Sequence, residues 1–371
     1  MPLIAVTKHD RFQVDDPPPV AERRPKQRSN ILAQVNHEAK ALHESTILVD
    51  GHNDHLILKY SRGEAFDFMK ANRRYHSDGA RLRVGGVTAS LFMVDGHELT
   101  RSMAMIEQTH REIEDHPDAL MLITRTRDIR TAKRTGRLGI VMSWESCTAL
   151  ENNLDILHLA HRLGLRSSTV THGEGGTEFA LQGTPSPFGY CTDAERDSYR
   201  RTSSGLTPFG KEAVQEINGL GILLDVAHAN DATFDDMLDL SGAPVISSHG
   251  GVFACSPHSR CSTDDQIRAL AASGGLLSIA FFDAFIAQPP KKATVQGIVD
   301  QICYVADLVG VDHVGIGTDF DGLPDNVWPV IRTANQLPRL TQAMLKRGLT
   351  PAEVRKVWGG NYLRVLRATI G

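Results

Sequence analysis

Two kinds of hydrophobic pattern alternate along the chain from about residue 31. The first kind spaces apolar residues by three and four, which predicts amphipathic helices, and most of these segments stop at glycine, a common helix terminator. We expect such helices over 31–46, 101–117, 153–164, 208–221, 264–275, 295–310 and 337–348. The second kind is a short apolar run without strict alternation. Runs of this kind are typical of parallel strands that are covered on both faces.

Eight apolar runs predict strands, over 47–54, 85–94, 138–145, 165–172, 221–228, 244–250, 274–282 and 313–322. Eight strands alternating with helices favour the α/β class and a single (β/α)8 TIM barrel with a short N-terminal extension. The alternative is a doubly wound open sheet, which a glycine-rich phosphate loop after the first strand would favour. No such loop follows that strand, and GEGGTE at 173–178 does not match the dinucleotide-binding pattern.

Two segments fall outside this alternation. Residues 1–30 hold three consecutive prolines and mixed charges, so we expect an extended arm there and the barrel domain over 31–371. The stretch 173–207 is polar, rich in Gly, Ser, Thr and Pro, and without periodicity. A loop this long in a compact domain is usually a lid or a binding loop.

Composition and targeting signals exclude several classes of protein. The chain has 371 residues and a net charge of -4, with 40 basic and 44 acidic residues, so we expect no nucleic-acid partner. Its five cysteines are spread out, which argues against a disulfide framework. We expect no secretory signal, because no apolar segment follows the early charges, and the sequence contains no apolar run of roughly 18 residues. We therefore expect a cytoplasmic protein with no membrane partner.

Ionisable residues stand at the C-terminal ends of the predicted strands, where barrel active sites are built. The set is His52, Asp54, Glu145, His172, His228, His249 and Asp319. Burying so many of these groups unpaired would cost a few kcal/mol each, whereas a metal would satisfy them together. A histidine that does not belong to such a set of ionisable residues is usually structural or on the surface. That interpretation applies to His43, His76, His97, His110, His116, His158, His161 and His313.

We predict a centre that holds two metal ions per chain, with His52, Asp54, Glu145, His228 and His249 as ligands. His52 and Asp54 are two residues apart in a strand and therefore point to one face. Glu145 lies on a strand between this pair and the later histidines, so it is a natural bridging carboxylate. Such donors suit Zn²⁺, with Mn²⁺, Co²⁺ or Fe²⁺ as alternatives. Ions about 3.5–4 Å apart can activate a bridging water as a hydroxide nucleophile.

Five segments of the chain together resemble the renal (membrane) dipeptidase family, peptidase family M19 of the metal-dependent amidohydrolase superfamily. They are VDGHND, GLTPFGKEAVQEINGLGILLDVAHAND, APVISSHGG, VGIGTDFDG and GGNYLRVL, and the resemblance runs from about residue 45 to the C-terminus. It implies a (β/α)8 barrel with two zinc ions that hydrolyses dipeptides and often tolerates a D-residue at the C-terminal position.

The resemblance also implies roles for individual residues. It assigns the same five metal ligands, and it makes His172 the group that polarises the scissile carbonyl. Arg260, eleven residues after His249, would hold the substrate carboxylate. Asp319 would contact the substrate amine and shuttle the proton. Asp321 is expected to be a turn residue or a support behind the ligands.

Three departures from the family pattern lie where substrate is read: Ser146-Cys147 after the glutamate, Gly173-Glu174-Gly175-Gly176 after His172, and Cys261 after Arg260. They leave open an amidohydrolase for another small carboxylate-bearing amide, lactam or lactone, and Glu174 would then favour a cationic group on the substrate. A catalytically silent metal-binding protein is a third alternative, against which the intact ligand set argues. Family members are often dimers, so a homodimer or larger homo-oligomer remains open.

Overall fold

The computed structural model describes residues 35–371, except 64–67, 73, 325–326 and 328. The arm predicted over 1–30 lies outside the described residues, as does the start of the helix predicted from residue 31. Within the described part of the chain, no helix is long and apolar enough to cross a membrane.

Eight parallel strands form the barrel wall in the order β1-β2-β4-β5-β6-β7-β8-β9. Their bounds are Leu48–Asn53 (β1), Val87–Met93 (β2), Leu138–Glu145 (β4), Leu165–Thr169 (β5), Leu223–Asp225 (β6), Val245–Gly250 (β7), Leu276–Ile279 (β8) and Val314–Ile316 (β9). The ring closes just past the ends of β9 and β1, where Asp54 N donates to Phe320 O at 2.9 Å and Asp319 N donates to His52 O at 3.2 Å. The predicted (β/α)8 barrel is confirmed.

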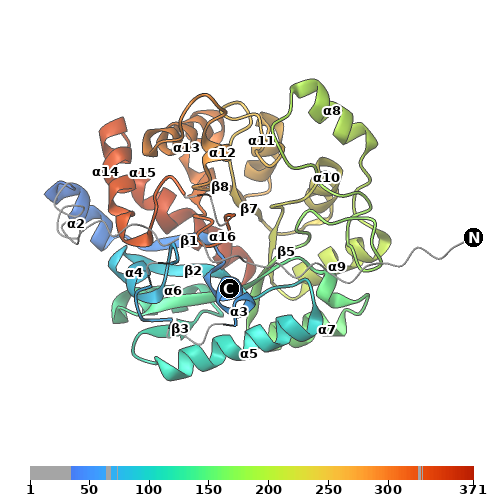
Figure 1. Cartoon of the computed structure of the whole chain (residues 1–371), viewed down its shortest axis with the longest axis horizontal. Coiled ribbons are helices and arrows are strands. Elements are labelled where there is room, and N and C mark those ends of the chain that lie inside the picture. Colours follow the sequence, from blue (N-terminus) through green and yellow to red (C-terminus); the bar gives the residue numbers. More distant parts are fainter. Residues whose placement is uncertain (1–34, 64–67, 73, 325–326, 328) are drawn as a thin grey trace, which may run out of the picture. The chain divides into compact units, whose positions relative to one another are not determined.

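Helices surround the strands (Figure 1). They are α2 (His37–Ser45), α3 (His55–Ser61), α4 (Gly79–Val84), α5 (Leu99–Asp115), α6 (Thr126–Thr135), α7 (Asp155–Arg162), α8 (Asp193–Thr202), α9 (Pro208–Gly219), α10 (Asp231–Leu240), α11 (Asp264–Ala272), α12 (Asp283–Ile286), α13 (Val295–Val309), α14 (Pro338–Arg347), α15 (Pro351–Arg355) and α16 (Asn361–Thr369). Local sequence fixes where many begin. In α9, for example, the Thr207 side chain accepts from Gly210 N and Pro208 occupies the first turn.

Alternate residues of the strands belong to two different hydrophobic clusters. Leu48, Phe92 and Leu224 pack in the larger cluster with the surrounding helices. Their neighbours Val49, Leu91 and Leu223 pack in a second cluster with Tyr362 of α16. Because successive strand residues point to opposite faces, both faces of the wall are buried. This explains why the runs lack strict alternation.

The structure corrects several boundaries predicted from the pattern. A three-residue strand, β3 (Leu120–Leu122), pairs with β4 outside the ring and was not predicted. The strands predicted over 165–172, 221–228, 274–282 and 313–322 are all shorter than expected. The loop predicted over 173–207 contains the helix α8, which a Thr192–Glu195 capping box starts. At the end of β6 the buried side chain of Asp225 binds the backbone and turns it, as described below.

Candidate metal centre and substrate pocket

Asp225, at the end of β6, connects three neighbouring strand ends. Its Oδ2 accepts from Thr169 Oγ1 at 2.6 Å, and its Oδ1 accepts from Ala227 N at 3.0 Å and from Ser248 N at 2.9 Å. These bonds shape the turn that leads to His228, which has φ of 65°, and they hold the backbone next to His249. One buried carboxylate therefore positions two predicted ligands.

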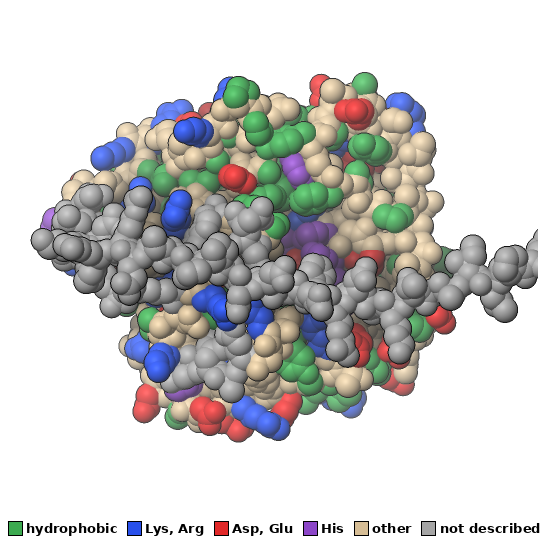
Figure 2. Space-filling view, in the orientation of Figure 1, with side chains coloured by type: hydrophobic (Ala, Val, Ile, Leu, Met, Phe, Trp, Pro, Cys, Tyr) green, Lys and Arg blue, Asp and Glu red, His purple; other side chains and the backbone are tan. Residues whose placement is uncertain are grey.

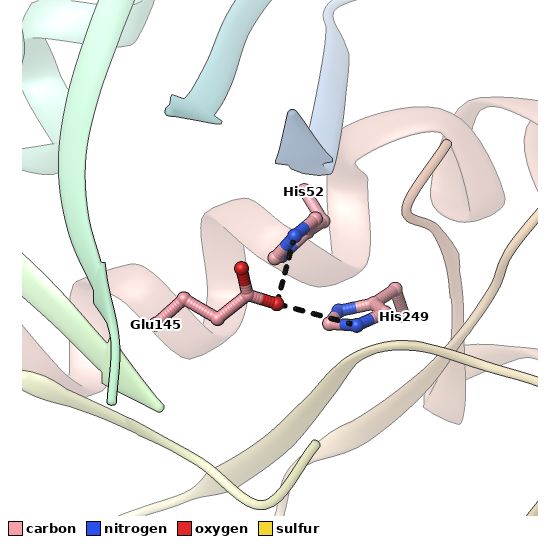
Figure 3. Close-up of side chains that lie close together, drawn as sticks. All are labelled: His52, Glu145 and His249. Atoms are coloured by element: carbon pink, nitrogen blue, oxygen red, sulfur yellow. Dashed lines mark ion pairs between the residues drawn. The ribbon is translucent and has the colours of Figure 1, made fainter. Parts of the chain in front are cut away.

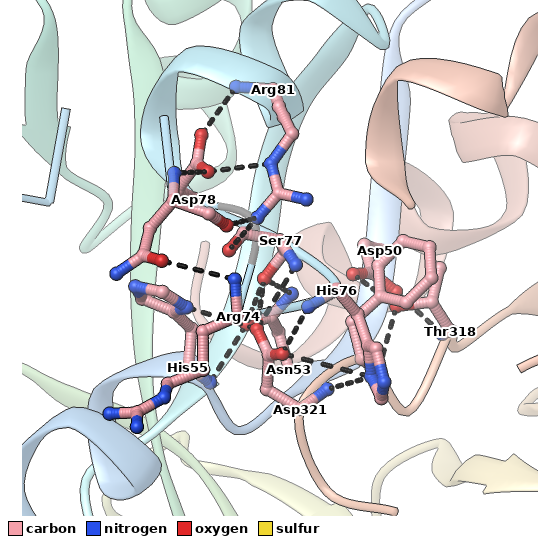
Figure 4. A network of polar contacts seen from close by, with 12 residues as sticks. Asp50, Asn53, His55, Arg74, His76, Ser77, Asp78, Arg81, Thr318 and Asp321 are labelled. Carbon is pink, nitrogen blue, oxygen red and sulfur yellow. Dashed lines mark hydrogen bonds and ion pairs between the residues drawn. The ribbon is translucent and has the colours of Figure 1, made fainter. Parts of the chain in front are cut away.

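Asp50 likewise connects neighbouring strands by hydrogen bonds, at the place where the ring closes (Figure 4). It accepts from Thr318 N at 2.7 Å, Thr318 Oγ1 at 2.9 Å and Ser90 Oγ at 3.2 Å. Burial raises the pKa of Asp50 to about 6, against the opposing effect of these hydrogen bonds. The result is that Thr318, and with it Asp319, is tied to β1 beside His52.

Asp321 is a buried residue that connects several segments of the chain, as Figure 4 shows. Its carboxylate accepts from His76 N at 2.6 Å, from Ser77 Oγ at 2.7 Å and from His55 Nδ1 at 3.0 Å. The residue has φ of 68°, so it turns the chain as well as supporting it. It thereby joins the loop before α4 to the segment that carries Asp319.

The predicted metal ligands converge on one oxygen, Glu145 Oε1. The Nε2 atoms of His228, His52 and His249 lie 3.2, 3.3 and 3.8 Å from it. Figure 3 shows His52 and His249 pointing at the same carboxylate oxygen, and their ring centroids lie 3.8 Å apart. His172 Nε2 lies 3.9 Å from the same oxygen. A carboxylate in this position could be shared by two metal sites.

Two aspartates complete the cluster. Asp54 Oδ2 lies 3.0 Å from His52 Nε2, and Asp54 and Asp319 form a group with His52 whose donor atoms lie within 4.8 Å of one another. The donors also form two other such groups: His52 with Glu145 and His249, and Glu145 with His172 and His228. All seven residues predicted from strand ends therefore meet at one place. Which donors hold which ion stays a prediction.

The donor atoms of the cluster have the chemistry that a metal site requires. Asp54 Oδ1 and His52 Nδ1 are buried without a hydrogen-bond partner among the described residues. Burial raises the pKa of Asp54 to about 7. Burial, followed by neighbouring positive charge that includes Arg260, lowers the pKa of His228 and His249 well below the usual histidine value. Neutral imidazole is the form that binds metals, so His228 and His249 fit a metal site. Burial favours the neutral form of His52 as well, but the neighbouring Asp54 and Glu145 carboxylates raise its pKa well above the usual histidine value.

A pocket of about 500 Å³ opens over the cluster, a size suited to a small-molecule ligand. Arg260 reaches into it from the loop after β7. Its Nη2 donates to His249 Nε2 at 2.8 Å, and its Nε is buried with no acceptor among the described residues. A guanidinium with a spare buried donor is suited to bind a carboxylate from the ligand.

Ser146 and Glu174, two of the residues at which the sequence departs from the family pattern, contact each other. Ser146 Oγ donates to Glu174 Oε1 at 2.5 Å, and Glu174 Oε2 accepts from His172 N at 2.6 Å. The carbonyl of Glu174 accepts from Gln182 Nε2 at 2.8 Å. The Glu174 carboxylate is therefore engaged within the protein. Glu174 is not among the residues that line the pocket, and a cationic substrate stays an untested alternative.

Several pocket residues were not singled out from the sequence. His97, which was expected to be a structural or surface histidine, is exposed and lines the pocket, and its ring centroid lies 5.2 Å from that of His172. Phe188, Phe282 and Phe285 line another part of the pocket. Only position after a strand could have indicated His97, and an isolated phenylalanine in a loop carries no comparable signal.

Comparison with known proteins gives one family. The family model described as membrane dipeptidase (peptidase family M19) matches residues 36–370. Dipeptidase tcpJ of Claviceps purpurea (strain 20.1) is 30% identical over 337 residues, which cover 86% of this chain and 76% of that protein.

Two solved structures resemble this fold at 26% identity. The structure of dipeptidase AC, a metallopeptidase of family M19, has a TM-score of 0.80 and covers 88% of this chain and 99% of its own. A metallopeptidase from Rhodobacter sphaeroides, solved with a phosphinate mimic of the dipeptide L-Ala-D-Ala, has a TM-score of 0.78 and covers 88% of this chain and 100% of its own.

Proposed function

Since this chain belongs to the membrane dipeptidase family of metal-dependent hydrolases, we propose that it hydrolyses the amide bond of dipeptides at a centre of two zinc ions. The observation that carries the proposal is the convergence of three imidazole nitrogens on Glu145 Oε1, within 3.2–3.8 Å. His52, Asp54, Glu145, His228 and His249 would hold the metal. Nitrogen and oxygen donors of this kind fit Zn²⁺, and Mn²⁺, Co²⁺ and Fe²⁺ are alternatives.

The metal, when bound, supplies Lewis-acid chemistry and lowers the pKa of water toward neutrality. The remaining work falls to three side chains. Asp319 accepts the proton of the attacking water and passes it to the leaving amine. His172 donates to the carbonyl oxygen as negative charge develops there. Arg260 binds the C-terminal carboxylate of the substrate and places the scissile bond over the cluster.

Hydrolysis of a dipeptide panel by the metal-loaded chain tests this function. We expect turnover with zinc and its loss in excess chelator, with recovery when zinc is restored. The panel includes L-Ala-L-Ala and L-Ala-D-Ala, because the Rhodobacter sphaeroides relative was solved with a mimic of the latter. A chain that carries metal yet cleaves none of the dipeptides would refute the proposal.

Glu174 should act as a positioning residue for His172. Glu174→Ala removes the acceptor of the His172 backbone N–H and of Ser146 Oγ, so the imidazole loses its fixed place. We expect kcat to fall roughly 10- to 100-fold with a smaller change in KM, since misplacement of about 1 Å can cost that much. Steady-state kinetics on a dipeptide, with thermal unfolding as a check on folding, measure this.

The matched control is Glu178→Ala, which removes an exposed carboxylate from the same loop. It should leave kcat within twofold. Glu174→Gln keeps one acceptor oxygen and should recover part of the loss. Equal kcat values for Glu174→Ala and Glu178→Ala would remove the positioning role.

A further inference from the structure

Three phenylalanines, Phe188, Phe282 and Phe285, form one side of the pocket; we refer to them as the aromatic wall. Phe188 comes from the loop between β5 and α8, whereas Phe282 and Phe285 lie at the N-cap and inside the short helix α12. Figure 2 shows hydrophobic side chains gathered beside the histidines on this face of the protein. Phe188 is 70% exposed, so most of its ring is accessible from the solvent.

Packing behind the wall gives it a defined shape. His258 meets Phe188 and Phe285 with ring centroids 4.8 and 5.0 Å apart, and Phe282 meets Phe285 at 4.8 Å. All three contacts are edge-to-face, an arrangement that aromatic rings favour. Phe285 is only 2% exposed, so the inner part of the wall is anchored in the protein. The outer ring, Phe188, is therefore held at one end of a continuous aromatic stack.

The imidazole of His258, which packs against the aromatic wall, is uncharged at neutral pH, so the wall and its support are both neutral. Burial lowers the pKa of His258 to about 4, and the neighbouring Arg260 adds to the effect. His258 Nδ1 accepts from Arg260 N at 3.2 Å, which uses its polar edge within the protein. Tyr190 packs on the same imidazole, with ring centroids 5.4 Å apart. An apolar side chain would find complementary surface at the wall, whereas a carboxylate would lose hydration without a partner there.

The wall is next to the group that would bind the substrate carboxylate. Arg260 Cζ lies 5.7 Å from the ring centroid of Phe285. In an amino acid the carboxylate and the side chain are both attached to the α-carbon. A residue whose carboxylate binds Arg260 therefore places its side chain within reach of the wall. The stretch of the pocket beside α5 is different, because His97, Asp95 and Arg101 line it and Arg101 donates to Ser61 Oγ at 2.8 Å.

We propose that the aromatic wall is the subsite for the C-terminal side chain, and that the preferred substrates are dipeptides whose C-terminal residue is aromatic or large and aliphatic. This inference rests on the proposed dipeptidase function, and specifically on Arg260 as the carboxylate-binding group. It adds the chemical class of the substrate to that function.

The test compares kcat/KM of the zinc-loaded full chain for L-Ala-Gly, L-Ala-Phe and L-Ala-Asp, with the last residue in both configurations. We expect the better configuration of L-Ala-Phe to exceed L-Ala-Asp by roughly 100-fold and L-Ala-Gly by roughly 10-fold. Differences of this size are what hydrophobic pockets give. The reversed series, Phe-Gly and Asp-Gly, should differ much less, because its variable residue lies away from the wall.

Phe188→Ala removes the exposed ring and should reduce the L-Ala-Phe to L-Ala-Gly ratio by roughly fivefold, mainly through KM. Phe188→Lys should move the preference toward L-Ala-Asp. The matched control is Tyr199→Ala, which removes a 40% exposed aromatic ring on α8 that does not line this pocket. It should leave the ratio as in the unmodified chain.

The outcomes separate the two claims. Turnover of dipeptides with no preference for L-Ala-Phe, or a preference that Phe188→Ala preserves as well as Tyr199→Ala does, overturns the subsite and leaves the dipeptidase function standing. No turnover of any dipeptide overturns the function, and the subsite with it.

Discussion

Glu145→Gln is expected to lower kcat/KM for every dipeptide substrate by about 1,000-fold or more. The substitution keeps the shape of the side chain and removes the charge on which three imidazoles converge at 3.2–3.8 Å. An amide is a poor bridging ligand, so the variant should also bind less than the normal complement of metal. Loss of groups that act as one catalytic unit commonly costs several orders of magnitude. Steady-state kinetics and metal analysis of the same preparation measure both effects.

A control for Glu145→Gln is Glu107→Gln on α5, where the side chain is 60% exposed and pairs with Arg111. The control should keep both activity and metal. Thermal unfolding in chelator distinguishes a lost site from a lost fold, since the barrel should unfold cooperatively in both variants. Full metal content together with kcat/KM within tenfold of normal in Glu145→Gln would contradict the central role of this carboxylate.

Arg260→Ala is expected to reduce kcat/KM for a free dipeptide by roughly 100- to 1,000-fold, chiefly through KM. The guanidinium reaches the pocket with a buried Nε that has no acceptor among the described residues. A hydrogen-bonded charge pair of this kind is worth about 2–5 kcal/mol when one partner is removed. Arg260→Lys should recover only part of the loss, because an ammonium cannot make the paired contacts of a guanidinium.

The substrate offers a matched control for Arg260. A dipeptide amide lacks the terminal carboxylate, so the unmodified chain should prefer L-Ala-Gly over its amide, and Arg260→Ala should abolish that preference. Metal content must be measured alongside, since Arg260 Nη2 contacts His249 Nε2. If Arg260→Ala retained both its metal and the preference for the free carboxylate, Arg260 would not be the carboxylate-binding group.

The barrel could be predicted from the sequence because its signal is local. In runs such as 47–54 and 138–145, consecutive residues are hydrophobic. The structure shows why, because the neighbours Leu48 and Val49 pack in different clusters on opposite faces of the strand. Strand ends were harder to place. β6 ends at Asp225 because that side chain bonds Thr169 and Ser248, which lie far away in sequence. No periodicity in a single strand reports such a bond.

The site likewise contains residues that the sequence could predict and residues that it could not. Histidines and carboxylates at strand ends could be found from position alone, because all parallel strands end at one edge of the barrel. The residues that hold them could not. Asp50 meets Thr318 from 268 positions away, and Asp321 meets Ser77 from 244. The Ser146–Glu174 contact was visible only as two separate departures from the family pattern, and the fold showed that they form one interaction.

Stepwise return of zinc to the metal-free chain, with dipeptide hydrolysis followed at each addition, tests the two-metal proposal most directly. The predicted result is activity that saturates at two zinc ions per chain, and no such titration curve for Glu145→Gln. Full activity at one ion per chain, or activity that does not depend on metal, would contradict the account.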